Sequence, residues 1–311
     1  MQTVFIVNPA AGQPGTREAV EKALLALHAP VAYEIYETTG PGDATRYVAA
    51  YASAHPETDV RFVACGGDGT LNEVVCGAVG HGNVSVTCYP CGSGNDFVKY
   101  YGGKDKFTDI GKLVAAPDRR IDLMRVNDTY SINVVNFGFD TCVCQTMINV
   151  RRKPLIGGKN AYTTGVVTAL IKAMRTRCKI TVDGAVINDG DMLLCTIANG
   201  HYVGGAFKCA PKSSNEDGLL DICKVAPIKR LRFPKLLGPY SAGKHLDEDS
   251  GFSDVITYLR GKRVEIDADD KFAVSVDGEI VTSPHFEIEI LPGALRFGVP
   301  EGAVLVAEEG K

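Results

Sequence analysis

Three short glycine-rich segments carry residues that could bind phosphate and metal. The most informative is Gly66-Gly67-Asp68-Gly69-Thr70, between a strand-like run at 60–65 and a helix-like run at 71–79. Its glycines allow positive φ and a close approach to phosphate, and the following helix directs its free N–H groups and positive dipole end at the same anion. Because bare phosphate would repel Asp68, its carboxylate indicates Mg²⁺ or a substrate hydroxyl nearby. The structural alternative is a tight turn with Asp68 or Thr70 as helix N-cap.

The other two segments also follow expected strands. The first is Asn8-Pro9-Ala10-Ala11-Gly12, and the third is Pro90-Cys91-Gly92-Ser93-Gly94-Asn95-Asp96-Phe97. In the third segment, small residues with a hydroxyl and an amide suit contacts to phosphate and ribose oxygens. A turn in which Asn95 or Asp96 caps a helix is an equal alternative.

The first 122 residues alternate strands and helices. Strands are expected at 3–7, 31–36, 60–64 and 84–89, and helices at 17–27, 43–54 and 71–79. This order predicts a three-layer α/β nucleotide-binding domain, with a parallel sheet covered by helices on both faces. Ligands should bind beyond the carboxyl ends of the strands, where all three glycine-rich segments lie.

From residue 121 onward, short strand-like runs are separated by turn signals. Asp183-Gly184 and Asp277-Gly278 are typical of tight hairpins, and helical stretches are expected at 163–176 and around 228–237. The pattern predicts a second domain over 123–292, an antiparallel β-sandwich, with the nucleotide cleft between the domains. The segment 293–311 is a candidate to return to the domain at 1–122.

Composition excludes several classes of protein. A net charge of −4 in 311 residues argues against nucleic acid as a partner. The N-terminus lacks the basic region of a signal peptide, and no apolar stretch reaches transmembrane length, so membrane contact would be peripheral. Ten cysteines without a secretory signal indicate free thiols in a reducing cytosol. We therefore expect a cytoplasmic protein.

The order and spacing of the motifs resemble the diacylglycerol kinase catalytic-domain family, and more closely its soluble bacterial lipid kinases, which are related to sphingosine kinases. The family's fold is similar to that of NAD kinases and phosphofructokinases. The likeness covers nearly the whole chain. Besides the three glycine-rich segments it includes Thr38 with Gly42-Asp43-Ala44, Arg120-Ile121-Asp122, Asp217-Gly218-Leu219-Leu220-Asp221 and Val276-Asp277-Gly278-Glu279.

The resemblance implies ATP- and Mg²⁺-dependent transfer of a phosphoryl group to a lipid alcohol, with diacylglycerol the leading acceptor. Glu279 would be the general base, Asp68 would hold Mg²⁺ or orient the hydroxyl, and Asp122 would belong to the same carboxylate network. Without the resemblance, Glu279 would be interpreted as a solvated hairpin carboxylate and Asp217 as a turn residue. The implied ATP-binding residues are Asn8, Pro9, Gly12, Thr38, Gly66, Gly67, Asp68, Gly69, Thr70, Leu71, Asn72 and Ser93. The implied ligands of a structural Mg²⁺ are Asp217 and the backbone carbonyls of Ser214 and Leu219.

The chain departs from the family pattern at two positions. Ser93 stands where the family commonly has Thr, and Gln13 where it often has a basic residue, so either Arg17 or Lys99 would hold the ATP phosphates. An NAD kinase shares Gly-Gly-Asp-Gly-Thr but has a different downstream signature. A nucleotide-sensing module without turnover would not need a base.

Two basic clusters could contact a membrane surface. They are Arg151-Arg152-Lys153, and Lys229-Arg230-Leu231-Arg232 followed by Phe233, Leu236 and Leu237. A solvated helix face over core leucines is an equal alternative. The sequence leaves the lipid acceptor and the oligomeric state open, including a homodimer formed by edge strands.

Overall fold

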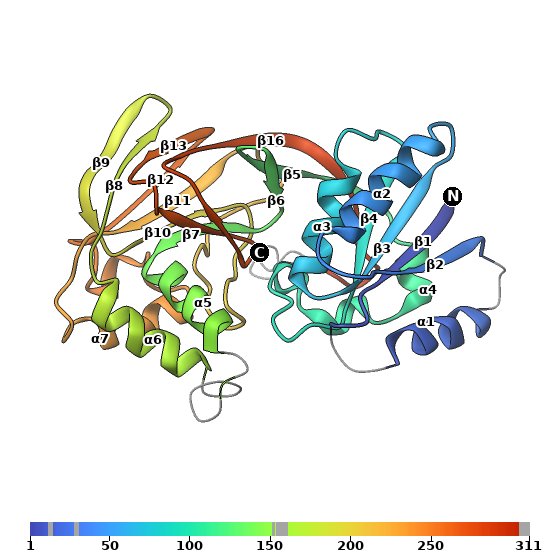
Figure 1. Cartoon of the computed structure of the whole chain (residues 1–311), viewed down its shortest axis with the longest axis horizontal. Coiled ribbons are helices and arrows are strands. Elements are labelled where there is room, and N and C mark those ends of the chain that lie inside the picture. The colour runs from blue at the N-terminus through green and yellow to red at the C-terminus, as the bar shows by residue number, and fades with distance from the viewer. Residues whose placement is uncertain (12–14, 28–30, 151–152, 154–160, 305–311) are drawn as a thin grey trace. The chain divides into compact units, whose positions relative to one another are not determined.

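The computed structural model describes residues 1–11, 15–27, 31–150, 153 and 161–304. The chain divides into two compact units (Figure 1). Unit 1 comprises Met1–Leu123, Asn215–Asp217 and the segment from Leu291 onward. Unit 2 comprises Met124–Ser214 and Gly218–Ile290.

Unit 1 is a parallel sheet covered by helices. Its strands β1 (Gln2–Val7), β2 (Tyr33–Glu37), β3 (Val60–Gly66) and β4 (Val84–Pro90) lie in the order β2-β1-β3-β4. The end of β16 (His285–Gly298) adds beside β4 through Phe297 and Val86, and β5 (Asp118–Val126) begins in this unit. Its helical segments are α1 (Thr16–Leu25), α2 (Asp43–Ala54), α3 (Asp68–Ala78), η1 (Phe97–Tyr101), η2 (Lys104–Phe107) and α4 (Ile110–Val114). Helix α2 packs on α3 and α1 on α4, and Figure 1 shows the two pairs on opposite faces of the sheet. The predicted three-layer α/β architecture is confirmed.

The strand order of unit 1 indicates where a ligand is expected to bind. The chain passes from β1 to β2 on one side and then to β3 on the other side of β1. The direction of winding therefore reverses between β1 and β3, and ligands of such sheets bind outside the carboxyl ends of the strands at this switch point. Asn8 follows β1 there, and Gly67 and Asp68 follow β3.

Unit 2 is a pair of packed sheets with helices on one outer face. Its elements are β6 (Thr129–Ser131), β7 (Val134–Gly138), α5 (Phe139–Val150), α6 (Ala161–Lys172), β8 (Thr176–Val182), β9 (Ala185–Met192), β10 (Leu194–Ala198), β11 (Leu220–Val225), α7 (Phe233–Ser241), η4 (Glu248–Ser250), β12 (Ile256–Gly261), β13 (Arg263–Asp267), β14 (Ala273–Val276) and β15 (Glu279–Thr282). One sheet is antiparallel in the order β12-β11-β10-β7-β14-β15. The other contains β9, β8, β13 and the first part of β16. This is the predicted antiparallel β-sandwich domain.

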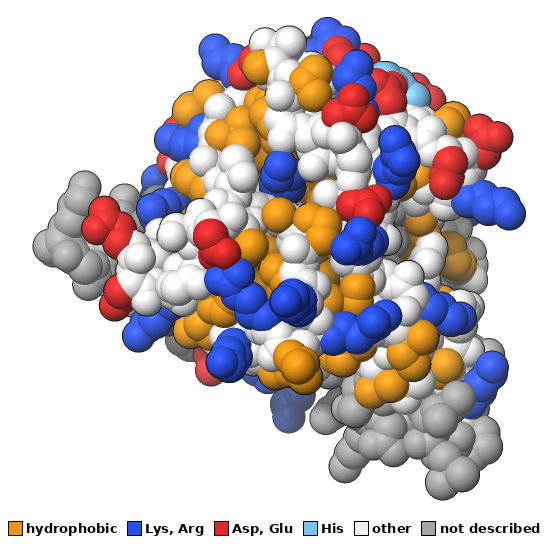
Figure 2. Space-filling model, turned by 90° about the vertical axis from the view of Figure 1, so that its left-hand side faces the viewer, with side chains coloured by type: hydrophobic (Ala, Val, Ile, Leu, Met, Phe, Trp, Pro, Cys, Tyr) orange, Lys and Arg blue, Asp and Glu red, His pale blue; other side chains and the backbone are white. Residues whose placement is uncertain are grey.

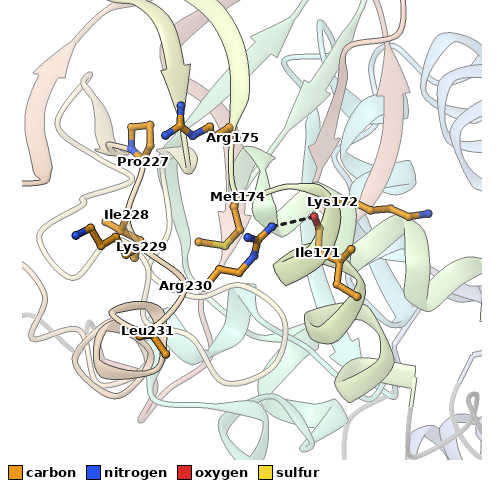
Figure 3. A pocket seen from close by; sticks show the side chains of 9 residues that line it. All are labelled: Ile171, Lys172, Met174, Arg175, Pro227, Ile228, Lys229, Arg230 and Leu231. Atoms are coloured by element: carbon orange, nitrogen blue, oxygen red, sulfur yellow. Dashed lines mark hydrogen bonds between the residues drawn. The ribbon is translucent and has the colours of Figure 1, made fainter.

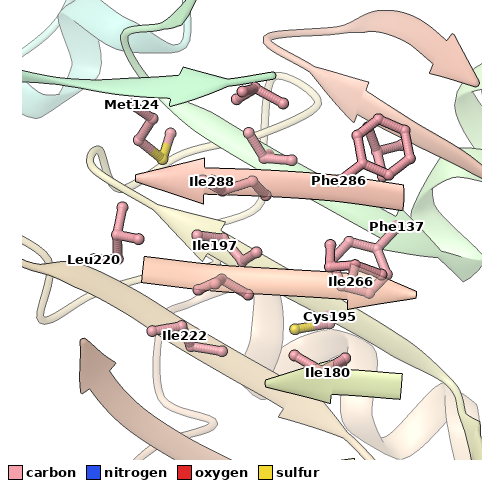
Figure 4. Packing of buried hydrophobic residues seen from close by; sticks show 14 of the residues in the cluster. Met124, Phe137, Ile180, Cys195, Ile197, Leu220, Ile222, Ile266, Phe286 and Ile288 are labelled. Carbon is pink, nitrogen blue, oxygen red and sulfur yellow. The ribbon is translucent and has the colours of Figure 1, made fainter. Parts of the chain in front are cut away.

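Two apolar layers stabilise unit 2. Between the sheets, side chains such as Phe137 and Ile197 meet Ile266 and Ile288 (Figure 4). Alternate residues of the same strands face the other way and pack under α5, α6 and α7. Period-2 alternation thus places an apolar side chain on each face of β7 and β10, because both faces are covered.

The two predicted Asp-Gly hairpins are confirmed. Asp183 and Gly184 have φ of 47° and 83° between β8 and β9, and Asp277 and Gly278 have φ of 48° and 95° between β14 and β15. Two consecutive residues with positive φ define the turn whose twist matches that of the strands.

The helices of unit 2 depart from the sequence prediction. The helix expected at 163–176 is α6, which ends at Lys172, because Thr176 already begins β8. The helix expected around 228–237 starts only at Phe233, since 226–232 form a loop. Helix α5 was not predicted, because its β-branched and apolar residues also suit a strand. Among the described residues, no helix is both long and apolar enough to cross a membrane.

Candidate active site

The loops after β3 and β4 pack together through their backbones. The carbonyl of Gly66 accepts hydrogen bonds from the amides of Cys91 at 2.7 Å and Gly92 at 3.2 Å. A Cβ on Gly66 would lie 2.3 Å from Thr70 Oγ1, and one on Gly92 would lie 2.6 Å from the Cα of Gly67. The close approach of the two loops therefore requires glycine at position 92, and the packing of Thr70 against the end of β3 requires glycine at position 66.

Helix α3 begins at the carboxyl end of β3 without a side-chain cap. Its N-cap is Gly67, in an extended conformation. The alternative in which Asp68 or Thr70 caps this helix is wrong, because both lie inside it. The N–H groups of a first helical turn that no side chain caps can receive an anion, and the helix dipole favours one there.

Two carboxylates and an ammonium group meet beside this helix end. Asp68 Oδ1 accepts hydrogen bonds from the amides of Asp96 at 2.7 Å and Phe97 at 3.4 Å. Asp96 Oδ1 in turn accepts from Lys99 Nζ at 2.6 Å. The Oδ2 atoms of Asp68 and Asp96 lie 2.9 and 3.7 Å from the point where a Cβ on Gly94 would stand. Carboxylate oxygens gathered in this way are the donors that Mg²⁺ prefers.

Asp96 is therefore a candidate site residue that the sequence analysis treated only as a helix cap. Its side chain is largely buried and lies on the Asp68 side of the loop. The sequence feature that could have identified Asp96 as a site residue is its position in a loop that follows a strand, at the same sheet edge as Asp68. Of the two cations considered for the phosphates, Lys99 belongs to this carboxylate cluster, whereas Arg17 pairs with Glu21 and Glu37.

The first loop joins the second through Asn8. Its Nδ2 donates to Thr70 Oγ1 at 3.0 Å, and its backbone amide donates to the Cys65 carbonyl. Its Oδ1 accepts from the amide of Ala10, which tightens the turn. Pro9 is exposed beside it, and Gly12 lies outside the described residues.

Glu73 of α3 organises the loop that follows β2. Its carboxylate accepts from the amides of Gly42 at 2.8 Å and Ala44 at 3.2 Å, so it caps α2 from a neighbouring helix. The buried Thr38 is tied to this edge through its amide, which donates to the Val7 carbonyl. Hydrogen bonds from Thr39 hold the pKa of the Asp43 carboxyl below its usual range.

The remaining residues that were predicted to bind ATP differ in exposure. Leu71 is buried in the core of unit 1, which gives it a packing role. Asn72 is partly buried on α3, and its Oδ1 accepts from Cys76. Ser93 is exposed on the loop after β4.

Asp122 is buried at a junction of three segments of unit 1. Its Oδ1 accepts from the amide of Gly293 at 2.7 Å, and its own amide donates to the Asn215 carbonyl at 2.7 Å. Asn215 Nδ2 also donates to Tyr101 Oη, and Arg119 pairs with both carboxylate oxygens of Glu216. These contacts explain why 215–217 belongs to unit 1. They give Asp122 a structural role, and its assignment to a catalytic network stays a prediction.

The implied metal loop has a mixed set of donors. Asp217 is exposed and belongs to unit 1, whereas Ser214 and Leu219 belong to unit 2. Within the described ranges no group of three His, Cys, Asp or Glu side chains could hold a metal. That finding does not bear on a site with one carboxylate and two backbone carbonyls, so this ligand set also stays a prediction.

The turn that carries Glu279 is fixed by its neighbour Asp277. One Asp277 oxygen accepts from Ser131 Oγ at 2.7 Å and from the amide of Val134 at 2.9 Å, and the other accepts from the amide of Ile132 at 2.9 Å. A carboxylate that receives several hydrogen bonds is held rigidly. Glu279 itself is exposed at the first position of β15. Its surroundings therefore combine a fixed backbone with an accessible carboxylate.

All ten cysteines are free, and each lies in the described part of the chain. Burial raises the pKa of the Cys91 thiol beside the third loop, and also that of Cys144, which donates to the Gly278 carbonyl. Raised thiol pKa values disfavour the reactive thiolate. Cys88 lies in β4 and Cys91 directly after it, so both are packing residues at the end of this strand.

Comparison with known proteins agrees with the two-unit organisation. Residues 2–126 match the diacylglycerol kinase catalytic domain, and residues 133–299 match the YegS C-terminal NAD kinase beta sandwich-like domain. The chain is 28% identical to the "Probable lipid kinase YegS-like" of Chromohalobacter salexigens, over 99% of this chain and 96% of that protein. It is 30% identical to the diacylglycerol kinase of Bacillus subtilis strain 168, over 88% of each.

A solved structure is also similar over nearly the whole length. It is a crystal structure of a candidate diacylglycerol kinase from Bacillus anthracis strain Sterne, with a TM-score of 0.73 and 27% identity, covering 97% of this chain and 98% of that one. The fold and the two family matches place the chain in a class of kinases that have an α/β domain followed by a β-sandwich domain. The chain belongs to the YegS and diacylglycerol kinase family of lipid kinases.

Proposed function

We propose that this protein transfers the γ-phosphoryl group of ATP to the hydroxyl of a lipid alcohol, with diacylglycerol as the leading acceptor. The observation that carries the proposal is the cluster of Asp68, Asp96 and Lys99 beside two glycine loops at the switch point of unit 1. Phosphoryl transfer depends on positioning and charge neutralisation, which this cluster is suited to supply. Family membership supports ATP as the donor, and the Bacillus subtilis relative named a diacylglycerol kinase supports that acceptor.

The nucleotide would bind along the carboxyl edge of the sheet. Phosphate oxygens would accept from the N–H groups at the start of α3, whose N-cap is Gly67 and which no side chain caps. Thr70 and Asn8 offer a hydroxyl and an amide at the same edge. Lys99 would contribute positive charge to the β- and γ-phosphates, since its ammonium group already lies at the cluster.

The carboxylates of unit 1 fit a divalent cation. Asp68 and Asp96 have oxygens within 4 Å of one point and would hold Mg²⁺ together with the phosphates. When bound, Mg²⁺ would neutralise charge that develops on the transferred group. A second, structural Mg²⁺ at Asp217 with the carbonyls of Ser214 and Leu219 is part of the same proposal.

Unit 2 would supply the acceptor and the base. Glu279 would accept the proton of the attacking hydroxyl, on a turn that Asp277 holds rigid. Because the acceptor resides in a bilayer, we place the protein in the cytoplasm, peripherally associated with the inner face of the membrane.

The proposal is tested by ADP release over a panel of acceptors. The panel contains diacylglycerol, phosphatidylglycerol, a sphingoid base and a polyprenol in mixed micelles, with NAD as the acceptor of the alternative kinase class. We expect Mg²⁺-dependent turnover with one lipid class and none with NAD. Turnover with NAD alone would replace the proposal by an NAD kinase.

Glu279→Gln separates the base from nucleotide binding. This variant should lose at least about a hundredfold in turnover, since a general base contributes roughly 10²–10⁴-fold, while its affinity for ATP in calorimetry stays unchanged. Full activity of E279Q would exclude Glu279 as the base.

A further inference from the structure

Unit 2 has a pocket of about 680 Å³ at the end of α6. Figure 3 shows its two walls, one formed by the residues that end α6 and lead into β8, the other by the loop before α7. Four cations line it: Lys172, Arg175, Lys229 and Arg230. None of its nine lining residues is acidic.

The positive charge of this pocket is only weakly compensated. Arg230 donates from Nε to the Leu170 carbonyl at 2.8 Å and from Nη2 to the Ile171 carbonyl at 3.4 Å. It therefore caps the C-terminal end of α6, and its partners are neutral carbonyls. Arg175 makes a 3.4 Å contact with Asp191. Both side chains are exposed, and an exposed ion pair of this kind compensates little of the arginine's charge. Lys172 and Lys229 are both exposed.

Arg232 does not belong to this surface, although the sequence groups it with Lys229 and Arg230. Both of its terminal nitrogens donate to Asp254 at 2.7 Å, and its guanidinium lies 5.1 Å from the ring centre of Phe252. Phe233 is the first residue of α7, and its side chain is buried. Of the other predicted cluster, Arg151-Arg152-Lys153, the two arginines lie outside the described residues. The cations that line the pocket are therefore Lys172, Arg175, Lys229 and Arg230, and Arg232 is not among them.

Exposed apolar side chains stand among these cations. Leu231 is 90% exposed, more than any other large hydrophobic side chain within the described ranges, and it follows Arg230 directly. Ile171 is 68% and Val167 of α6 is 51% exposed. Figure 2 looks at the side where unit 2 is drawn, and Lys and Arg side chains gather among hydrophobic ones in its lower half, at the height of α6 and α7 in Figure 1. Exposed leucines beside lysines and arginines are typical of surfaces that lie in a membrane interface.

We propose that this basic pocket docks the protein on an anionic bilayer, with Leu231 and Ile171 entering the acyl region and lipid phosphates lying over Lys172 and Lys229. The inference rests on the proposed function, because a lipid alcohol is presented to its kinase in a bilayer. Charge complementarity identifies the occupant, since four cations without a lining carboxylate match a phosphate-bearing surface. The pocket would hold one headgroup, and the leucine would anchor the loop beside it.

The test is cosedimentation of the full chain with vesicles, without ATP. Vesicles of phosphatidylcholine containing about 30% phosphatidylglycerol are compared with phosphatidylcholine alone, at about 50 mM and about 500 mM salt. The variant K172E/K229E should bind the anionic vesicles at least about 25-fold more weakly at low salt, at about fivefold for each cation lost and with added repulsion from the two new carboxylates. The matched control K104E/K106E changes two exposed lysines of unit 1 by the same charge and should bind like the wild type.

A second variant separates the apolar contribution. Leu231→Ser should weaken binding about tenfold at both salt concentrations, because burial of a leucine side chain does not depend on charge. The position is exposed, so this change leaves the fold intact. Wild-type binding by both variants, or equal binding of the wild type to neutral and anionic vesicles, would overturn the docking proposal.

Activity distinguishes failure of docking from failure of the proposed function. K172E/K229E should turn over a short-chain acceptor dispersed in detergent at the wild-type rate, and lose turnover only on vesicles. Loss of vesicle binding in the variants while even the wild type turns over no lipid would support docking and reject the kinase proposal. Equal loss on detergent-dispersed acceptor would assign the pocket to catalysis and overturn docking.

Discussion

Gly94→Ala tests the carboxylate cluster through a single added methyl group. The alanine Cβ would stand 2.9 Å from Asp68 Oδ2, closer than such contacts occur, and 3.7 Å from Asp96 Oδ2. Gly94 does not have a positive φ, so its backbone accepts alanine without strain. The Asp68 carboxylate must therefore turn away, which disturbs its 2.7 Å bond to the Asp96 amide.

The expected loss follows from that hydrogen bond. A bond to a charged group contributes about 1.5–3 kcal/mol, which corresponds to roughly a ten- to hundredfold fall in kcat/KM if Asp68 positions the reacting groups. The assay is ADP release in diacylglycerol mixed micelles at varied ATP, with thermal unfolding as a check of the fold. Gly82→Ala is the matched control, because no atom lies within 4 Å of its added Cβ.

Combining G94A with D68N tests whether the added methyl group acts through Asp68. Since the effect passes through Asp68, G94A should add little to a protein that already carries D68N. Equal activity of G94A and G82A would refute the role of Asp68. Full additivity on the D68N background would show that the methyl group acts elsewhere.

Further predictions concern stability, measured as the free energy of urea unfolding. Burial raises the pKa of Asp140 to about 6, so the folded chain keeps a proton that the unfolded chain releases, and stability falls as pH rises from about 4 to about 6. D140N should add about 3 kcal/mol near pH 7 and little near pH 4, and equal gains at both would contradict this. Burial lowers the pKa of His245 to about 4, so stability is lost as pH falls from about 6.5 to 4. H245Q should remove about 3 kcal/mol of that loss, whereas an unchanged acid slope would exclude His245. Arg61 is buried in β3 and donates to Ser85 and Asp118, so R61M should cost about 3–5 kcal/mol; a loss below about 1 kcal/mol would show that the site repacks.

The elements that local patterns specify could be predicted. Alternating strand and helix periods with glycine at the strand ends specify the sheet of unit 1, and helix α2 lies at the predicted 43–54. The Asp-Gly pairs at 183 and 277 specify two hairpins, because they accept positive φ at low cost. The sheet edge at which we propose that phosphate binds follows from strand order alone.

Features that depend on distant partners could not be predicted. Arg61 stands in a strand whose seven residues are all buried, and only Ser85, Asp118 and two backbone carbonyls make that favourable. Asp96 gains its role only when the loop after β4 reaches Asp68. The loop conformation at 226–232 and the ion pair of Arg232 with Asp254 likewise arise from tertiary packing.

The most direct test of the central claim follows the phosphoryl group itself. ATP labelled in its γ-phosphoryl group is incubated with the protein, Mg²⁺ and diacylglycerol in mixed micelles, and the solvent-extracted lipid is counted. We expect label in a phosphorylated lipid with the wild type, and a loss of at least about a hundredfold with E279Q. A folded, ATP-binding wild type that leaves the label in the aqueous phase with every lipid alcohol of the panel would contradict it.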